Sequence, residues 1–346
     1  MENGSSPERL KVGFSIGEAG GVGPQLLLRF LEGEGWQDHL IPIAFGHRRV
    51  IERWRSHLGL RSLRYHLIRH PHEAKPEQLN LIECGEISDF SIGKPHASTG
   101  SLARQSFIRA VQEAAAGSID LLVSLPVDKA TFYDEVTFPY RGHTEYLRST
   151  FPKFSPVMMM VSDSLRVAVA TEHIPLREVP ALLSEERLRT TIRILHQSLK
   201  RDFAIPAPRI ALLGLNPHAG DGGLIGDEEK RLLEPLITSL WEEGIFVGGP
   251  FPPDGFFAKK QYAQVDAVLA LYHDQGLIPF KILAGWEGFQ FSAGLPFVRT
   301  SPDHGVAYDV AGSEEVDNAS LVAAVWEGLS IVRRRRAWDK ESTVRE

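Results

Sequence analysis

Three histidines follow apolar segments of the chain, at the places where β-strands are expected to end. His173 comes after residues 165–170, His218 after residues 210–215 and His273 after residues 266–271. Parallel strands of an open α/β sheet end at one edge, where ligands bind. One such histidine is usually structural, but three neutral imidazoles with open coordination positions predict a catalytic metal site. Asp274, beside His273, is a candidate metal ligand, orienting partner or base.

A second group of side chains is suited to binding an anion. His143 and Thr144 stand side by side in the sequence and can both donate hydrogen bonds to a phosphate or carboxylate. Lys281 and Arg299 are candidate anion clamps, and Gln290 lies between them with an amide. Without other information, Lys281 and Arg299 would be interpreted as surface charges.

Glycine-rich segments stand at three expected loops. Residues 17–24 match neither the G-x-G-x-x-G fingerprint nor the P-loop, so a plain strand-to-helix turn is an alternative to ligand binding. Residues 216–223 include Gly222, a candidate cofactor contact, because glycine-rich backbone before a helix can offer N–H groups to an anion. A capped turn with an incidental histidine is the alternative there. Asp303, His304 and Gly305 begin a loop that could hold an adenosine group.

Short apolar segments alternate with amphipathic ones along the chain. The strand candidates are residues 11–16, 41–45, 121–125, 157–161, 165–170, 210–215 and 267–272. The helix candidates are residues 25–32, 48–58, 102–116, 185–203, 227–243 and 320–335. This alternation predicts a largely parallel α/β sheet. Residues 64–78 are expected to form a surface excursion, and the arginines at 333–336 are expected to end the last helix in solvent.

The composition is that of a globular protein rather than a nucleic-acid or membrane protein. The chain has 346 residues, 43% of them hydrophobic, and a net charge of −6, so no basic surplus suggests nucleic-acid binding. No apolar run approaches the roughly 20 residues of a membrane span, and we see no signal peptide in the polar first residues. A single cysteine, Cys84, suits a reducing compartment. We therefore expect a soluble, cytoplasmic protein.

Several short motifs occur in a characteristic order. They are Gly-Glu-x-x-Gly-x-Gly-Pro at 17–24, Gly-His-Thr-Glu at 142–145, Asn-Pro-His-Ala-Gly at 216–220, Tyr-His-Asp-Gln-Gly at 272–276 and Gly-Leu-Pro-Phe-Val-Arg-Thr at 294–300, followed by Asp-His-Gly. Together they resemble the 4-hydroxythreonine-4-phosphate dehydrogenase family, from about residue 11 to residue 332.

The resemblance implies an isocitrate/isopropylmalate dehydrogenase-like α/β fold, with two α/β domains and an active-site cleft between them. We place the first domain at residues 1–128 plus 302–346, with both termini. The second, residues 129–301, would carry the metal and the dimer interface. The family works as a homodimer with shared active sites.

The resemblance also implies a reaction. The C3 hydroxyl of 4-phosphohydroxy-L-threonine would be oxidised with NAD or NADP, and the β-keto acid would lose carbon dioxide, in pyridoxal 5′-phosphate biosynthesis. One divalent ion (zinc, magnesium or cobalt) would be held by His173, His218 and His273. The substrate-binding positions fall on His143, Thr144, Lys281, Gln290 and Arg299. The loop of Asp303, His304 and Gly305 resembles the adenosine-side loop of the wider dehydrogenase group.

This sequence departs from the family pattern at several positions. Gln290 stands where Asn is usual, Asp128 where many members have His, and Val306 where Thr is common. The catalytic base is left open among Asp274, Asp254, Lys129 and a metal-bound hydroxide.

Three other functions stay open at this point. The substrate could be 4-phospho-D-erythronate or 4-phospho-D-threonate, for which Gln290 is the hint. The chain could be a metal-dependent hydrolase of phosphorylated compounds, since three histidines with an open position would serve that chemistry too. It could also be a metabolite-binding relative without activity, although such a protein need not keep the three histidines.

Overall fold

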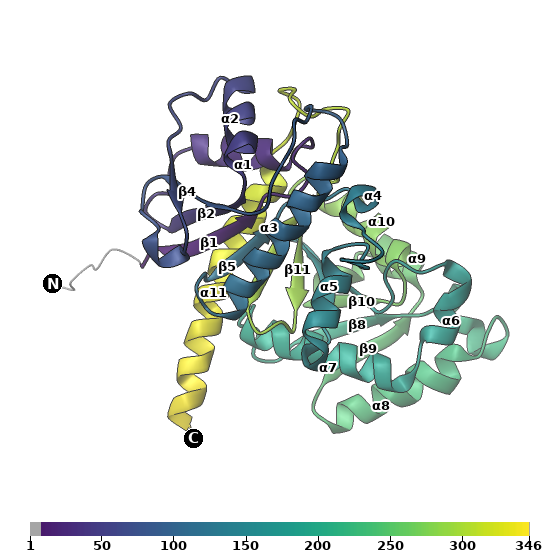
Figure 1. Cartoon of the computed structure of the whole chain (residues 1–346). Helices are drawn as coiled ribbons and strands as arrows, with labels where there is room; N and C mark the ends of the chain where they lie inside the picture. The colour runs from purple at the N-terminus through teal and green to yellow at the C-terminus, as the bar shows by residue number, and fades with distance from the viewer. Residues whose placement is uncertain (1–7, 346) are drawn as a thin grey trace. The chain divides into compact units, whose positions relative to one another are not determined.

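The computed structural model describes residues 8–345 (Figure 1). Contacts divide the chain into two compact units. Unit 1 is Met1–Thr150 with Pro296–Val332, and unit 2 is Phe151–Leu295 with Arg333–Glu346. This division differs from the expected domains of 1–128 plus 302–346 and 129–301. Residues 129–150 and 296–301 group with unit 1, and residues 333–346 group with unit 2.

The sheet of unit 1 is parallel. Its strand order is β3 (Tyr65–Ile68), β4 (Leu79–Glu83), β2 (Leu40–Gly46), β1 (Leu10–Ser15), β5 (Leu121–Ser124) and β12 (Val298–Pro302). The apolar segments predicted at 11–16, 41–45 and 121–125 are confirmed as strands. Residues 64–78 lie mostly at the surface, as expected, but they also contain the strand β3, which the prediction missed. It is an edge strand beside β4: Tyr65 and His66 are partly buried, Leu67 is exposed and Ile68 is buried.

Helices connect these strands, and several of them cover the sheet. They are α1 (Gly23–Glu32), α2 (Arg48–His57), the 3-10 turn η1 (Pro71–Glu73), α3 (Ala97–Ala115), α4 (Lys129–Phe132) and α5 (His143–Thr150). Helix α1 has Pro24 in its first turn, where no intrahelical N–H is needed. Helix α3 packs against β1, β2 and β5 and buries Leu102, Phe107 and Val111.

The sheet of unit 2 is mixed. Its strand order is β11 (Phe289–Ala293), β6 (Val157–Val161), β7 (Arg166–Val169), β10 (Ala267–Ala270), β8 (Arg209–Leu213) and β9 (Phe246–Phe251). Strand β6 runs antiparallel to β11 and β7, whereas β7, β10, β8 and β9 are parallel. The carboxyl ends of β7, β10 and β8 therefore lie at one edge of the sheet.

Helices and short turns complete unit 2. They are η2 (Pro152–Phe154), η3 (Leu176–Glu178), α6 (Val179–Leu182), α7 (Glu185–Arg201), η4 (Pro217–Gly223), the π-helical turn η5 (Glu229–Leu233), α8 (Glu234–Glu242), α9 (Pro253–Ala258), η6 (Gln261–Gln264) and α10 (His273–Ala284). Helix α7 starts at the N-cap Ser184 and buries an apolar stripe of Leu188, Ile192, Leu195 and Leu199, as the helical spacing predicts.

The last helix, α11 (Ala319–Arg345), continues beyond the arginines at 333–336. The prediction that they form a solvated helix end is wrong, because Arg335 is buried in unit 2. Arg335 Nε donates to Asp202 at 2.8 Å, and Arg335 Nη1 donates to the Leu295 carbonyl at 3.1 Å. Ser198 Oγ also donates to Asp202, at 2.6 Å. Within residues 8–345, every helix is too short or too polar to cross a lipid bilayer.

Candidate functional site

The predicted site residues are divided between the two units, and each group is described by itself. Unit 1 contains His143, Thr144, Arg299, Asp303, His304 and Gly305. Unit 2 contains His173, His218, Gly222, His273, Asp274, Lys281 and Gln290.

Two of the three predicted metal-binding histidines of unit 2 lie against each other. His173 follows β7, and His273 begins α10 shortly after β10, the parallel neighbour of β7. The ring centroids of His173 and His273 are 5.5 Å apart, and the rings are inclined by 43°. Beside them, Thr171 Oγ1 donates to the Leu271 carbonyl at 2.7 Å, which ties the two strand ends together. The proximity expected from the strand ends is therefore present for this pair.

His273 is oriented by its neighbour in the sequence. Its Nδ1 lies 2.7 Å from Asp274 Oδ1. An ionised carboxylate only accepts hydrogen bonds, so Nδ1 carries the hydrogen and Nε2 keeps its lone pair. This is the arrangement by which a carboxylate orients a metal-binding imidazole. Among the roles left open for Asp274, the geometry favours orienting His273.

His218 lies in a loop with unusual backbone geometry. Six consecutive residues have positive φ: His218 (53°), Ala219 (51°), Gly220 (78°), Asp221 (42°), Gly222 (66°) and Gly223 (97°). Each of the three non-glycine residues costs about 1–2 kcal/mol in this left-handed region. The loop therefore needs compensating interactions from its surroundings.

Glu229 supplies these interactions from the π-helical turn η5. Its Oε1 accepts from the backbone N–H groups of Leu215 at 2.7 Å and Asn216 at 2.8 Å. Its Oε2 accepts from Asn216 Nδ2 at 2.9 Å. Hydrogen bonds to a charged group contribute about 1.5–3 kcal/mol each, so the three together are comparable with the cost of the left-handed residues. Single π-turns are frequent at functional sites.

The side chains of His173 and His273 form a pair, but the three predicted ligands are not gathered into one metal-binding group. Over residues 8–345, no group of three or more His, Cys, Asp or Glu side chains is placed to hold a metal ion. The backbone nevertheless carries His173, His273 and His218 after three adjacent strands, β7, β10 and β8. His173 and His218 are exposed, so both can reach a ligand. Three imidazoles on one sheet edge are a donor set that fits a divalent ion.

The other predicted residues of unit 2 have different surroundings. Lys281 is exposed on α10, and Gly222 is exposed in the η4 loop. Gln290 is on β11, paired with Met160 of β6. Its amide nitrogen is buried and has no hydrogen-bond partner among the residues that the structure describes. A buried amide without a partner costs free energy, so Gln290 is suited to binding a ligand.

In unit 1, Arg299 is a buried support for His143. Arg299 is on β12 and is 1% exposed, although arginine is rarely buried. Its Nε donates to Ser124 Oγ of β5 at 2.8 Å, and its Nη2 also contacts Ser124 Oγ. The same Nη2 lies 3.2 Å from His143 Nδ1. Guanidinium can only donate, so Nδ1 accepts and the hydrogen of His143 is on Nε2.

His143 is therefore a neutral donor at the start of a helix. Burial, and then the positive charge of Arg299, hold the pKa of His143 well below its usual range. Its ring lies between Phe107, at 4.2 Å, and Phe132, at 5.4 Å between centroids. The Nε2 atom is buried, and it has no hydrogen-bond partner within residues 8–345. Thr144 follows in the first turn of α5, where the helix dipole favours an anion.

The predicted cofactor loop is held against the glycine-rich loop of unit 1. The Val22 N–H donates to the Val306 carbonyl at 3.0 Å. A Cβ on Gly21 would lie 2.3 Å from Val306 Cγ1, so only glycine fits this approach. Gln25 accepts from the Gly312 N–H at 2.8 Å. At the start of the loop, the Asp303 N–H donates to Ser320 Oγ at 2.7 Å.

Two carboxyl groups, Glu18 and Asp128, bind neighbouring segments at the carboxyl edge of this sheet. Glu18 follows β1 and accepts from the Gly20 N–H at 3.1 Å and from Thr131 Oγ1 at 3.2 Å. Tyr308, in the cofactor loop, donates to Asp128 at 3.0 Å. Burial raises the pKa of Glu18, and the nearby charge of Asp128 raises it further. Asp128, one of the departures from the family pattern, therefore has a partner in this chain.

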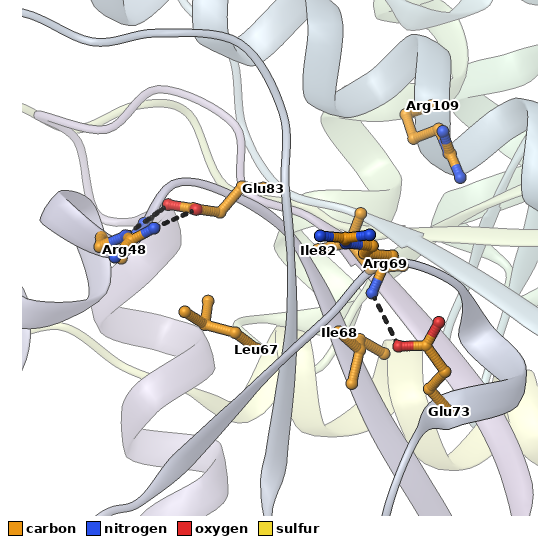
Figure 2. Close-up of a pocket in the computed structure, with 8 residues that line it drawn as sticks. All are labelled: Arg48, Leu67, Ile68, Arg69, Glu73, Ile82, Glu83 and Arg109. Atoms are coloured by element: carbon orange, nitrogen blue, oxygen red, sulfur yellow. Dashed lines mark hydrogen bonds and ion pairs between the residues drawn. The ribbon is translucent and has the colours of Figure 1, made fainter.

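A separate cavity of about 710 Å³ opens in unit 1 (Figure 2). It is lined by Arg48, Leu67, Ile68, Arg69, Glu73, Ile82, Glu83 and Arg109. Figure 2 shows Arg48 bonded to Glu83, and its Nε and Nη2 donate at 2.9 and 2.7 Å. The cavity contains none of the predicted site residues, and one of its arginines is neutralised by a glutamate. We assign it no part in the function.

The fold and the site place this chain among the α/β enzymes that act on a small ligand. Its polar side chains lie at the ends of strands, where α/β sheets bind their ligands. The chain belongs to the family described as "Pyridoxal phosphate biosynthetic protein PdxA", whose family model matches residues 38–327. A curated relative from Bacteroides thetaiotaomicron, named 4-hydroxythreonine-4-phosphate dehydrogenase, is 36% identical over 95% of this chain and 90% of its own length. One of that name from Chromobacterium violaceum is 38% identical over 92% of this chain and 96% of its own length.

Solved structures agree with this assignment. The 4-hydroxythreonine-4-phosphate dehydrogenase of Klebsiella pneumoniae has a TM-score of 0.79 and 31% identity, over 95% of this chain and 99% of that one. A terephthalate 1,2-cis-dihydrodiol dehydrogenase from Burkholderia xenovorans shares the fold, with a TM-score of 0.62 at 24% identity over 93% of this chain and 98% of that one.

The family resemblance drawn from the motifs is confirmed, and so is the α/β fold class. The chain is an oxidoreductase, and its dehydrogenase family indicates a nicotinamide cofactor. The hydrolase and the inactive binding protein are therefore set aside.

Sequence reasoning missed the residues that support the site. Glu229, Ser124 and Thr171 each hold a candidate site residue or its loop in place. Glu229 shows one sequence signal, because it ends an acidic run at 227–229 shortly after the Asn-Pro-His-Ala-Gly motif. Ser124 and Thr171 show none, because hydroxyl residues at strand ends are common.

Proposed function

We propose that this chain oxidises 4-phosphohydroxy-L-threonine to 2-amino-3-oxo-4-phosphooxybutanoate, which decarboxylates to 3-amino-2-oxopropyl phosphate. The observation that carries the proposal is the similarity to relatives named for this activity, which extends over nearly the whole chain. The reaction belongs to pyridoxal 5′-phosphate biosynthesis, and we propose a cytoplasmic location. NAD or NADP is the hydride acceptor.

His173, His218 and His273 would hold one divalent ion: zinc, magnesium or cobalt. The pairing of His173 with His273 supports this assignment. An ion bound there would supply Lewis-acid polarisation of the C3 hydroxyl, which would lower the pKa of that hydroxyl. Asp274 holds a proton on His273 Nδ1, so that Nε2 stays available. Asp254, in the first turn of α9, and Lys129, at the start of α4, are the candidate bases.

The phosphate of the substrate would bind at the start of α5. His143 donates from Nε2, and Thr144 can donate from its hydroxyl. Arg299 keeps His143 neutral and aligned and adds positive charge from behind it. Lys281 and Gln290 would bind other polar groups of the substrate. The buried, unpartnered amide nitrogen supports Gln290 in this role.

The dinucleotide would bind along the loop that starts with Asp303, His304 and Gly305. Gly305 is exposed, and a Cβ added there would meet no neighbouring atom among the described residues, so a ligand can approach its backbone closely. In unit 2, Gly222 would contribute a backbone N–H to an anionic group of the cofactor.

We propose that the enzyme is a homodimer with shared active sites. Support comes from large apolar side chains exposed on and beside α10, namely Ile278, Ile282 and Trp286, which are 58%, 76% and 67% exposed. Leu224, in the loop after His218, is 84% exposed. Exposed apolar groups of this kind are typical of protein interfaces. Light scattering should give twice the chain mass, and a monomer at working concentration would contradict the dimer.

The first experiment measures NAD(P)H formation by the metal-loaded protein with 4-phosphohydroxy-L-threonine and with each dinucleotide. 4-Phospho-D-erythronate and 4-phospho-D-threonate serve as competing substrates. The amino acid should be oxidised fastest. Faster oxidation of either sugar acid would replace the proposed substrate, and Gln290, with its longer amide side chain, is the residue that favours this second candidate.

A further inference from the structure

We infer that Glu229 is a positioning residue for metal binding, which holds the loop carrying His218 in its binding conformation. The inference rests on the proposed function in one respect, namely that His218 is a metal ligand. Glu229 itself contacts the backbone of the loop and the Asn216 side chain, not the ion.

Both carboxylate oxygens of Glu229 are used by the loop. Oε1 binds the N–H groups of Leu215 and Asn216, and Oε2 binds the Asn216 side chain. Glu229 is 1% exposed, so its carboxylate is held among these donors rather than in solvent. His218 follows Asn216 by two residues, which makes the direction of its side chain depend on these bonds.

The loop also packs directly on the Glu229 carboxylate. A Cβ on Gly220 would lie 2.8 Å from Glu229 Oε2 and 2.8 Å from the Gly226 carbonyl. A Cβ on Gly226 would lie 2.3 Å from Asn216 Nδ2. The left-handed backbone at Gly220 thus passes close to the carboxylate. Without Glu229, the N–H groups of Leu215 and Asn216, which come just before the left-handed residues, would lose their acceptor.

His218 differs in this respect from the other two histidines. His173 and His273 follow strands that Thr171 joins, and their rings are already adjacent. His218 is carried by an exposed loop outside the strands. The ability of His218 to bind the ion together with His173 and His273 therefore depends on how well its loop is fixed before the ion binds. We assign to Glu229 the function of fixing this loop.

The test compares Glu229→Ala with Glu228→Ala. Glu228 is a matched control, because its Oε2 also accepts from Asn216 Nδ2, at 2.7 Å, but it binds no backbone N–H of Leu215 or Asn216. Co²⁺ is titrated into the metal-free full-length protein, and affinity is measured by calorimetry. Amide hydrogen exchange of residues 215–226 is measured on the same metal-free samples.

Glu229→Ala should weaken Co²⁺ binding about 10–100-fold, the usual effect of removing a support of a metal ligand. The amides of Leu215 and Asn216 should lose protection, and Glu228→Ala should stay close to the wild type in both measurements. Wild-type affinity in Glu229→Ala, or unchanged protection of the two amides, would overturn the inference.

If Glu229→Ala does not fold, Glu229→Gln decides. The oxygen of the Gln amide can still accept from both backbone N–H groups. Its NH₂ group, however, would face the NH₂ group of Asn216, and two donors cannot bind each other. The affinity of Glu229→Gln for Co²⁺ should therefore lie below that of Glu228→Gln. Equal affinities would overturn the inference. A wild-type protein that binds no Co²⁺ would refute the proposed metal site, and the role of Glu229 toward it, while the exchange data would still show whether Glu229 holds the loop.

Discussion

Replacing His143 tests whether a neutral imidazole binds the phosphate of the substrate. In the structure, Arg299 donates to Nδ1, so Nε2 is the only donor that His143 can offer. A hydrogen bond to a charged phosphate contributes about 1.5–3 kcal/mol. Since 1.4 kcal/mol is a factor of ten, His143→Ala should raise the KM for the phosphorylated substrate about 10–150-fold.

The assay is the initial rate of NAD(P)H formation, with substrate and dinucleotide varied in turn. The KM for the dinucleotide should change little. His143→Gln should recover part of the loss, because its amide can place an N–H group near the Nε2 position. Thermal melting of both variants checks that loss of the ring between Phe107 and Phe132 has not unfolded unit 1.

The pH dependence gives a sharper test of the same reasoning. Burial and the charge of Arg299 hold the pKa of His143 well below its usual range, so the imidazole is already neutral through the neutral pH range. The wild type and His143→Gln should therefore share one pH profile of substrate KM around neutral pH. A step in the wild-type profile near the usual histidine pKa that disappears in His143→Gln would refute the assignment of a permanently neutral donor.

Three other substitutions test separate parts of the structure. The raised pKa of Glu18 means that the folded state holds the Glu18 proton more tightly than the unfolded chain does. The resulting stabilisation of the folded state is complete below the usual glutamate pKa. It is lost as the pH rises through the pKa of Glu18 in the folded state. Glu18→Gln should thus gain stability relative to the wild type as pH rises in urea unfolding, and a constant difference would contradict the shift. Arg335→Met leaves the 2%-exposed carboxylate of Asp202 without its charge partner, and should lower the free energy of unfolding by about 3–5 kcal/mol. The double variant with Asp202→Leu should recover most of this loss. A loss below about 1 kcal/mol for Arg335→Met would indicate a surface ion pair instead. Tyr308→Phe removes the bond to Asp128 and should raise the KM for the dinucleotide about 5-fold, and an equal rise for the phosphorylated substrate would argue against a role in the cofactor loop.

The sequence predicts the fold best where strands are continuously apolar. Strands β1, β5 and β6 coincide with predicted segments because their residues are buried on both faces. Strand β12 escapes the pattern, because Arg299, Thr300 and Ser301 bring polar groups into the core. Strand β9 escapes it because glycines and a proline interrupt its sequence.

The candidate site is predictable in its chemistry but not in its supports. Local sequence marks the apolar strands that precede His173 and His273. Their shared placement then follows from the rule that parallel strands end at one edge of the sheet. The bond between Arg299 and His143 joins residues 156 positions apart, and nothing in either neighbourhood indicates the other. The conformation of the His218 loop depends on Glu229, which contacts the loop only after η5 has formed. These contacts are formed by tertiary packing, and the local sequence around each residue does not predict them.

The late position of β12 in the chain affects how the protein is made. Strand β5 pairs with β1 on one side and β12 on the other, and Leu121 is matched with Val298, a separation of 177 residues (298 minus 121). At the usual rate of synthesis, about 5–20 residues per second, the ribosome needs roughly 10–35 s to bridge that distance. During this interval the apolar Leu121–Ser124 edge stays open to pairing with other nascent chains. Abundant chaperones should therefore raise the yield of soluble enzyme, and fragments that stop before residue 298 should aggregate.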